Sequence, residues 1–420
     1  MKEVAIKFHG YKCSLCDAEY QPNEAIYTCR HDGGNLDIVY DYESLQRDLS
    51  PEGIFSSKEN SLWRYLPLLP VKKIHAPGTP MQAVGWTPVF SPPELRRQLK
   101  IENLWIKDES RNPTASFKDR ASAVVVAQAL ETGVEIVVTA STGNAGAALA
   151  GMAAAAGQKA VIFAPRNAPP AKIAQLLIYE AQVLLVDGNY DQAFDLSIAA
   201  SNEFGWYCRN TGYNPFSLEG KKTAAYEIWE NVIHQQSFKK SLAVFVSVGD
   251  GNIISGLHKG FKDLQALGWL ERMPRIFGVQ AEGSAAIANA FKARVEEITP
   301  VSANTLADSI SVDLPRDGVR AVRAASQTGG AYVTVSDDDI LSAIADLGRV
   351  GIFAEPAGAT SYAGLKEALK RGLVGSDDPI VVLNTGSGLK DVNAAMQAVT
   401  PAEIIEPSLS ALEQVLERFG

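Results

Sequence analysis

The chain has 420 residues, 46% of them hydrophobic, so it can bury a large core, and its length predicts two to three domains. Its formal net charge of −9 and its pI near 5.3 exclude nucleic acid and an anionic membrane surface as expected partners. The sequence predicts neither a secretory leader nor an apolar run of the roughly 18 residues that span a membrane. Four cysteines are too few for a disulfide framework, so the predicted compartment is the cytoplasm.

The first predicted unit is a small cysteine-containing module at residues 1–43. A Cys-x-x-Cys pair and a later cysteine are spaced as in part of a zinc ribbon, and an aspartate stands where the fourth ligand would come. His31 is an alternative fourth ligand. The candidate ligands are Cys13, Cys16, Cys29 and Asp32. A metal-free knuckle of small buried thiols is the competing interpretation, so the spacing leaves zinc open.

The second predicted unit, residues 44–420, alternates strand and helix patterns. After a polar connecting segment, apolar strand-like runs fall at residues 103–107, 135–139, 159–163, 181–186, 242–246, 275–280 and 380–383, with helix patterns at 118–130 and 144–156. The strand-like runs do not alternate between apolar and polar residues, which indicates parallel sheets covered on both faces. The predicted fold class is therefore α/β.

A lysine motif, Ser-Phe-Lys-Asp-Arg at residues 116–120, follows a Pro-Thr turn and opens one of these helix patterns. A lysine serves best as a Schiff-base nucleophile when packing and neighbours lower its pKa. Taken alone, Lys118 would be interpreted as a surface helix lysine. Asp119 and Arg120 are predicted to form a structural ion pair.

Three glycine-rich turns follow predicted strands, at residues 141–146, 248–253 and 384–391. The free N–H groups and the positive dipole end of a helix suit a carboxylate or a phosphate. Ligands of parallel sheets bind beyond the carboxyl ends of the strands, where all three turns fall. One such turn is typical of an ordinary connection; three of them together with Lys118 predict a binding site.

The order of these four motifs resembles that of the pyridoxal-phosphate enzymes of the tryptophan-synthase-β type, fold-type II, and within them the threonine synthase family. The segment Asn-Pro-Phe-Ser-Leu-Glu-Gly-Lys-Lys-Thr at residues 214–223 is similar to that family's Asn-Pro-x-Arg-Leu-Glu-Gly-Gln-Lys-Thr. The N-terminal module resembles the family's leader, so the likeness covers nearly the whole chain. It implies two parallel-sheet subdomains, with the smaller one, at about residues 121–213, inserted in the larger.

The resemblance also implies roles for single residues. Lys118 would be the Schiff-base lysine and proton shuttle, Asn144 would bind the cofactor's 3′-oxygen, and Thr385 would meet the pyridine nitrogen. The implied residues for pyridoxal 5′-phosphate are Lys118, Asn144, Gly249, Asp250, Gly251, Asn252, Ile253 and Thr385. The implied residues for the amino-acid substrate are Ser141, Thr142, Ala145 and Asn214.

The pattern departs from the family where a substrate phosphate would bind. Ser217 replaces an arginine of the family motif, and the segment at residues 306–312 lacks a second one. Candidates to replace the lost charge are Arg209, Arg316, Lys221 and Lys222. A charged contact to phosphate contributes roughly 1.5–3 kcal/mol, so these changes bear on substrate choice and leave the cofactor chemistry intact.

Three functions therefore compete. The first is threonine synthase, a carbon–oxygen lyase acting on O-phosphohomoserine. The second keeps the cofactor but acts as a serine/threonine dehydratase or a β-replacement enzyme. The third is a non-catalytic amino-acid sensor, against which the retention of Lys118 argues. The oligomeric state is open, with a homodimer as the expected assembly.

Overall fold

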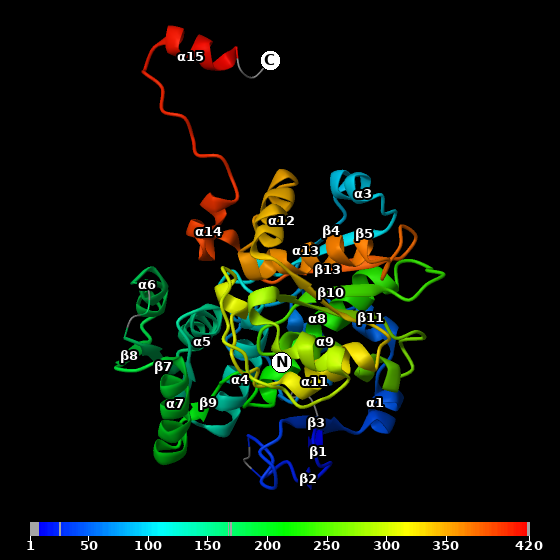
Figure 1. Cartoon of the computed structure of the whole chain (residues 1–420). Coiled ribbons are helices and arrows are strands. Elements are labelled where there is room, and N and C mark those ends of the chain that lie inside the picture. Colours follow the sequence, from blue (N-terminus) through cyan, green and yellow to red (C-terminus); the bar gives the residue numbers. More distant parts are fainter. Residues whose placement is uncertain (1–7, 25–26, 167, 169, 418–420) are drawn as a thin grey trace.

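The computed structural model describes residues 8–24, 27–166, 168 and 170–417, and it contains three sheets. Two of them are the cores of α/β layers, and the third belongs to the N-terminal module (Figure 1). The structure therefore confirms the predicted α/β class. Among the described residues, no helix has the length and apolar character needed to cross a bilayer.

The larger sheet has six strands in the order β12-β11-β10-β13-β5-β4. Its strands are β4 (Val89–Phe90), β5 (Leu104–Asp108), β10 (Ala243–Ser247), β11 (Arg275–Ala281), β12 (Tyr332–Val335) and β13 (Ile380–Asn384). All neighbours are parallel except β4 and β5. The central strands are buried on both faces: Val244 and Val246 enter one core cluster, whereas Ala243 and Phe245 enter another. This two-sided burial explains why the strands lack polar alternation.

Helices cover both faces of this sheet. The helices of the larger unit that precede or follow the small sheet in the chain are α1 (Tyr42–Asp48), α2 (Pro51–Phe55), α3 (Pro93–Leu99), α8 (Phe216–Ile228), α9 (Asn252–Ala266), α10 (Ala286–Ala293), α11 (Gly318–Ser326), α12 (Asp337–Arg349) and α13 (Pro356–Lys370). The α8 and α9 helices pack closely against each other, because Gly256 and Gly260 of α9 approach the backbone and side chains of α8. A Cβ at Gly260 would lie 2.4 Å from the Lys222 carbonyl oxygen.

The smaller sheet has four parallel strands in the order β8-β7-β6-β9. These are β6 (Ile136–Ala140), β7 (Lys159–Pro165), β8 (Gln182–Val186) and β9 (Tyr207–Cys208). Its helices are α4 (Lys118–Thr132), α5 (Asn144–Ala155), α6 (Pro170–Ile178) and α7 (Tyr190–Phe204). The α4 helix also packs against α8, so it joins the small sheet to the larger unit (Figure 1).

The N-terminal module is an antiparallel sheet of β1 (Phe8–Cys13), β2 (Glu19–Tyr20) and β3 (Leu36–Tyr40). It is tied to the α/β unit by polar contacts, one buried and one partly buried. The Tyr40 hydroxyl donates to Glu219 Oε2 at 2.6 Å, and Arg320 Nη1 donates to Asp37 Oδ1 at 2.7 Å. These contacts place the module against α8 and α11.

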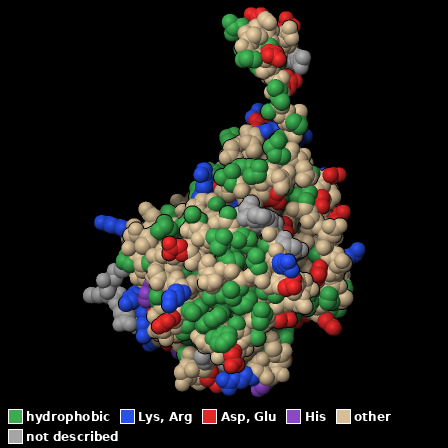
Figure 2. All heavy atoms as spheres, turned by 90° about the vertical axis from the view of Figure 1, so that its left-hand side faces the viewer, with side chains coloured by type: hydrophobic (Ala, Val, Ile, Leu, Met, Phe, Trp, Pro, Cys, Tyr) green, Lys and Arg blue, Asp and Glu red, His purple; other side chains and the backbone are tan. Residues whose placement is uncertain are grey.

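The chain ends with α14 (Val392–Gln397) and α15 (Leu409–Leu416). The segment after α14, which ends in α15, stands off the body of the molecule (Figure 1 and Figure 2). The α15 helix carries Leu409, Leu412 and Leu416, all of which are exposed. Residues 399–417 therefore contribute nothing to the core that positions the cleft described next.

Candidate active site

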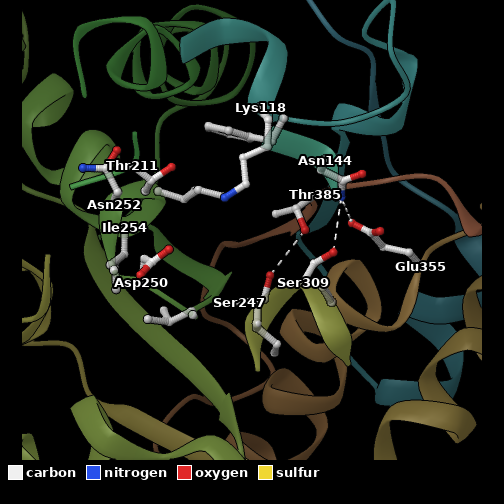
Figure 3. A pocket seen from close by; sticks show the side chains of 17 residues that line it. Lys118, Asn144, Thr211, Ser247, Asp250, Asn252, Ile254, Ser309, Glu355 and Thr385 are labelled. Carbon is white, nitrogen blue, oxygen red and sulfur yellow. Dashed lines mark hydrogen bonds between the residues drawn. The ribbon is translucent and has the colours of Figure 1, made fainter. Parts of the chain in front are cut away.

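The start of α4 is held by the third glycine turn, although the two are far apart in sequence. Phe117 N–H donates to the Thr385 carbonyl oxygen at 2.9 Å, and Ser387 N–H donates to the Ala115 carbonyl oxygen at 3.1 Å. Ala115 adopts a left-handed conformation (φ 64°), which turns the chain sharply into the helix. The Lys118 side chain is thereby fixed beside Thr385 (Figure 3).

The prediction of an Asp119–Arg120 ion pair is wrong. The Asp119 carboxylate accepts two hydrogen bonds from Thr114, one from the backbone N–H at 2.6 Å and one from the hydroxyl. These bonds close the turn before α4. Arg120 instead pairs with two buried glutamates, Glu109 at 2.7 Å and Glu227 at 2.5 Å. Consecutive helix residues point in different directions, so partners from other elements win.

This ion network lies inside the protein. Arg120, Lys107, Glu109 and Glu227 are all fully buried, and Lys107 Nζ donates to Glu227 Oε2 at 2.7 Å. Burial alone would raise the pKa of Glu227, but Arg120 and Lys107 outweigh it and hold that pKa at about 2. The network holds the first turn of α4, which begins at Lys118, against β5 and α8.

The first glycine turn connects β6 to α5. A Cβ at Gly146 would lie 2.2 Å from the Ser141 carbonyl oxygen, so only glycine permits this close approach. Gly143 lines the cleft, and a Cβ there would meet no protein atom within 4 Å. The first-turn N–H groups of α5 have no partners within the helix and are available to an anion.

The second glycine turn connects β10 to α9. Gly251 has a positive φ of 92° and precedes the first residue of α9, Asn252. A side chain at Gly251 would collide with the Asp317 carbonyl oxygen at 2.6 Å.

These turns meet at one pocket. It is lined by all eight residues implied for the cofactor, namely Lys118, Asn144, Gly249, Asp250, Gly251, Asn252, Ile253 and Thr385, together with Thr211, Ser247, Ser309 and Glu355. Figure 3 shows Lys118, Asp250 and Thr385 arranged around this space. An adjoining cleft of about 430 Å³ shares Lys118 and Asn144 with it and is lined by Ser141, Thr142 and Ala145.

Lys118 has an electrostatic environment suited to a nucleophile. Burial lowers the pKa of its ammonium group, and the nearby Arg209 guanidinium lowers it further. Asp250 and Glu355 oppose this shift but do not cancel it. A lowered pKa increases the fraction of neutral amine, which is the form that attacks a carbonyl group.

Glu355 is a pocket residue that the sequence motifs did not reveal. Asn144 Nδ2 donates to Glu355 Oε1 at 2.8 Å, and Glu355 reaches the pocket as the residue before α13. Burial raises the pKa of this carboxyl to about 7, and the bond from Asn144 offsets only part of the rise. The one sequence signal was an acidic residue before a proline at a helix start, Glu355-Pro356, which is also common at ordinary helix starts.

Glu355 predicts a pH dependence of stability. Its pKa rises from 4.5 to about 7 on folding, so the folded state retains a proton that the unfolded state loses. The free energy of unfolding should therefore fall between about pH 4.5 and 7, by up to about 3 kcal/mol from this group. Urea unfolding of the cofactor-free protein should show this fall, and Glu355→Gln should lack it. Equal pH profiles for the two proteins would contradict the burial of an ionisable Glu355.

Comparison with known proteins assigns the chain to a family. Residues 80–386 match the family described as "Pyridoxal-phosphate dependent enzyme". A threonine synthase of Methanocaldococcus jannaschii is 38% identical over 97% of this chain and 99% of its own length. Another, from Methanosarcina acetivorans, is 36% identical over 97% and 98%. The chain belongs to the threonine synthase family. The resemblance recognised in the motifs is thus confirmed.

Solved structures show the shared fold of this family. Threonine deaminase isoform 2 from Solanum lycopersicum has a TM-score of 0.63 at 23% identity, covering 86% of this chain and 95% of that one. Diaminopropionate ammonia lyase from Escherichia coli has a TM-score of 0.65 at 19% identity, covering 84% and 94%. At these identities the likeness establishes the fold-type II architecture and nothing about substrate.

Pyridoxal phosphate is the cofactor of this family, and the residues present fit it. The pocket offers a buried lysine with a lowered pKa for the aldehyde and a glycine-flanked helix start for the phosphate. Gly249 and Gly251 bring backbone to the pocket wall. A hydroxyl, that of Thr385, also lines the pocket, where a neutral pyridine nitrogen would be tolerated.

Asn214, which the resemblance implied as a substrate contact, is not among the residues that line the pocket or the adjoining cleft. Its Nδ2 donates to the Cys208 carbonyl oxygen at 2.7 Å, and its Oδ1 accepts from Phe216 N–H at 2.8 Å. Both polar ends of the amide therefore build the turn before α8. Ser217 is also fully buried, and its hydroxyl donates to the Arg209 carbonyl oxygen at 3.2 Å. The geometry favours a structural part for both residues.

The four candidate metal ligands of the N-terminal module converge. The ligand atoms of Cys13, Cys16, Cys29 and Asp32 all lie within 4.8 Å of one another. The set contains Asp32 and not His31. Three soft sulfurs and one carboxylate oxygen suit a tetrahedral zinc ion. Backbone N–H groups of Leu15 and His31 lie 3.3 and 3.4 Å from sulfurs of the set, as expected where thiolates bind a metal.

Proposed function

We propose that this chain is a threonine synthase, which uses pyridoxal phosphate to convert O-phosphohomoserine and water to threonine and phosphate. One observation carries the proposal: the eight implied cofactor residues line one pocket in a chain that is 38% and 36% identical to threonine synthases over nearly their full lengths. Two threonine deaminases among the solved structures share only the fold, each at 23% identity.

In this proposal Lys118 holds the cofactor through its Nζ and then moves a proton at the substrate's Cα. Its lowered pKa supports both tasks, since each needs the neutral amine. Bound pyridoxal phosphate supplies the electron sink that makes protons near the amino group acidic. The N–H groups of the turn at residues 141–145 hold the α-carboxylate at the start of α5.

Asn144 and Thr385 orient the cofactor in this proposal. The Asn144 amide lines the pocket, is positioned by its bond to Glu355 and would bind the ring oxygen. The Thr385 hydroxyl lines the pocket and would meet the pyridine nitrogen, where, unlike a carboxylate, it would not stabilise a protonated nitrogen by charge. A less electron-poor ring favours elimination and replacement over transamination.

The proposal is tested by incubating the purified, cofactor-loaded protein with O-phosphohomoserine and following threonine and phosphate together. Equal amounts of both products are expected. Free threonine and free serine are tested as alternative substrates in separate reactions. Rapid formation of a keto acid from either of them, with no phosphate from O-phosphohomoserine, would support the dehydratase alternative instead.

We also propose that the chain divides into an N-terminal module, residues 1–43, and a catalytic unit, residues 44–420, with a smaller subdomain inserted at about residues 121–213. The N-terminal module binds zinc through its three convergent sulfurs and Asp32. Elemental analysis should find about one zinc per chain in wild-type protein. Cys29→Ser should lose that zinc, because a hydroxyl is a poor ligand compared with a thiolate. The matched control is Cys208→Ser, a buried cysteine outside the cluster, which should retain it. Equal zinc content in both variants would refute the site.

A homodimer and a cytoplasmic location complete the proposal. The acidic composition and the scarcity of cysteines support the cytoplasm, although neither bears on assembly. Light scattering of the purified protein measures the mass directly. A mass of one chain at working concentration would overturn the dimer and leave the proposed reaction untouched.

A further inference from the structure

Two buried cations lie next to the cofactor pocket, and the roles proposed above use neither. Arg209 follows β9, Lys221 lies on α8, and both side chains are fully buried. Lys221 Nζ donates to Oδ1 of Asn252, the first residue of α9 and part of the pocket lining. Arg209 Nη1 donates to the Thr211 hydroxyl at 2.8 Å, and Thr211 lines both the pocket and the adjoining cleft.

Within the described part of the chain, these cations bond only to uncharged groups: the Asn252 amide and the hydroxyls of Thr211 and Ser122. Nη2 of Arg209 is buried and has no hydrogen-bond partner there. The neighbouring Lys222 differs, because Glu219 and Asp263 pair with it. A buried cation without a negative partner is strongly unfavourable, so Arg209 and Lys221 require an anion from elsewhere.

The pKa shifts of Arg209 and Lys221 also indicate that these cations lack a negative partner. Burial lowers the pKa of Lys221 well below its ordinary value, and Lys118 and Arg209 lower it further. Burial also lowers the pKa of Arg209, to about 10. Asp250 and Asp317 oppose the shift at Lys221, and Asp119 and Asp250 oppose it at Arg209. Asp317 is already bound by Arg320 at 2.6 Å, and Asp119 accepts from Thr114. Arg209 and Lys221 form no ion pair with any of these carboxylates in the part of the chain that the structure describes, so a bound dianion would balance their charge.

We propose that Arg209 and Lys221, with Thr211 and Asn252, form a buried site for a phosphate monoester dianion at the start of α9. The free N–H groups of the first turn of α9 add donors to the two cations. The proposal rests on the proposed function, which brings two phosphate monoesters to this cleft: the cofactor and O-phosphohomoserine. Lys221 also stands where the family motif has glutamine, one helical turn after Ser217, which replaces the family arginine. Lys221 therefore places a positive charge on the same face of α8 as Ser217.

The test uses Lys221→Gln, which restores the family residue and is expected to fold, together with Arg209→Gln. The first arm titrates cofactor-free protein with pyridoxal phosphate and with pyridoxal, followed by visible absorbance. The second arm titrates cofactor-loaded protein with O-phosphohomoserine and with homoserine, followed by the change in that absorbance. Lys292→Gln, an exposed lysine on α10, is the matched control.

Each variant should weaken binding of the phosphorylated ligand by about 10-fold or more, as expected for a charged hydrogen bond to phosphate, and leave the unphosphorylated ligand within about 2-fold. Selective loss in the first arm assigns the site to the cofactor, and selective loss in the second assigns it to the substrate. Equal losses for phosphorylated and unphosphorylated ligands, or no loss, would overturn the proposal. The first arm needs no turnover, so its result stands even if the protein makes no threonine.

Discussion

Replacing Lys118 by alanine is expected to lower threonine formation by about 10³-fold or more, because the variant loses both the covalent anchor of the cofactor and the base at Cα. Its side chain is the one lysine amine that lines the pocket in the part of the chain described by the structure. Borohydride treatment of the wild-type protein should fix the cofactor on the peptide that contains Lys118. The Lys118→Ala protein should lose the visible absorbance that depends on this bond.

Lys292→Ala is the matched control for this experiment, since Lys292 is exposed and lies on α10 away from the cleft. It should retain activity, absorbance and labelling. Recovery of the label on a different lysine would remove Lys118 from the proposed role. So would a Lys118→Ala protein that turns over at the wild-type rate.

Replacing Arg120 by methionine is expected to lower the free energy of unfolding by about 3–5 kcal/mol. The side chain is fully buried and forms bidentate contacts with Glu109 and Glu227. Removal of the guanidinium leaves one of the two carboxylates, Glu109, with Lys107 at 3.7 Å as its closest cation. Urea unfolding of the cofactor-free protein measures the loss.

The control is Arg97→Met on α3, which removes an exposed pairing with Glu94. The urea midpoint of this variant should match that of wild type, because exposed ion pairs contribute little. If Arg120→Met also unfolds at the wild-type midpoint, the buried network does not stabilise α4. Activity should fall with Arg120→Met, since the network holds the helix that begins at Lys118.

Most of the strands that sequence patterns predicted are largely buried, whereas β8 was predicted from residues 181–186 although it is largely exposed. Runs such as residues 242–246 and 380–383 stand out because no polar residue interrupts them, and the structure places them at β10 and β13. The short strands β4 and β12 were not predicted. Their sequences, Val89–Phe90 and Tyr332–Val335, are too short for a pattern and depend on pairing with β5 and β11.

Site residues on recognisable turns could be found from sequence, and those defined by tertiary contacts could not. The three glycine turns can be recognised in the sequence because their backbone geometry requires glycine. Glu355 belongs to no such motif, and it matters because burial and neighbours from other elements give it its properties. Arg209 was predicted only as one of four candidate charges, and its burial beside the pocket emerges from the fold. Asn214 shows the reverse, because its motif suggested a substrate contact and the fold uses its amide in a turn.

The most direct test of the central claim is turnover of O-phosphohomoserine in ¹⁸O-labelled water. Elimination of phosphate followed by addition of water at Cβ breaks the carbon–oxygen bond of the ester. The hydroxyl oxygen of the threonine should therefore carry ¹⁸O, while the released phosphate retains only its original oxygens. Label in the phosphate together with homoserine as product would mean simple ester hydrolysis at phosphorus, and the account of Lys118 and its pocket as a threonine synthase site would be contradicted.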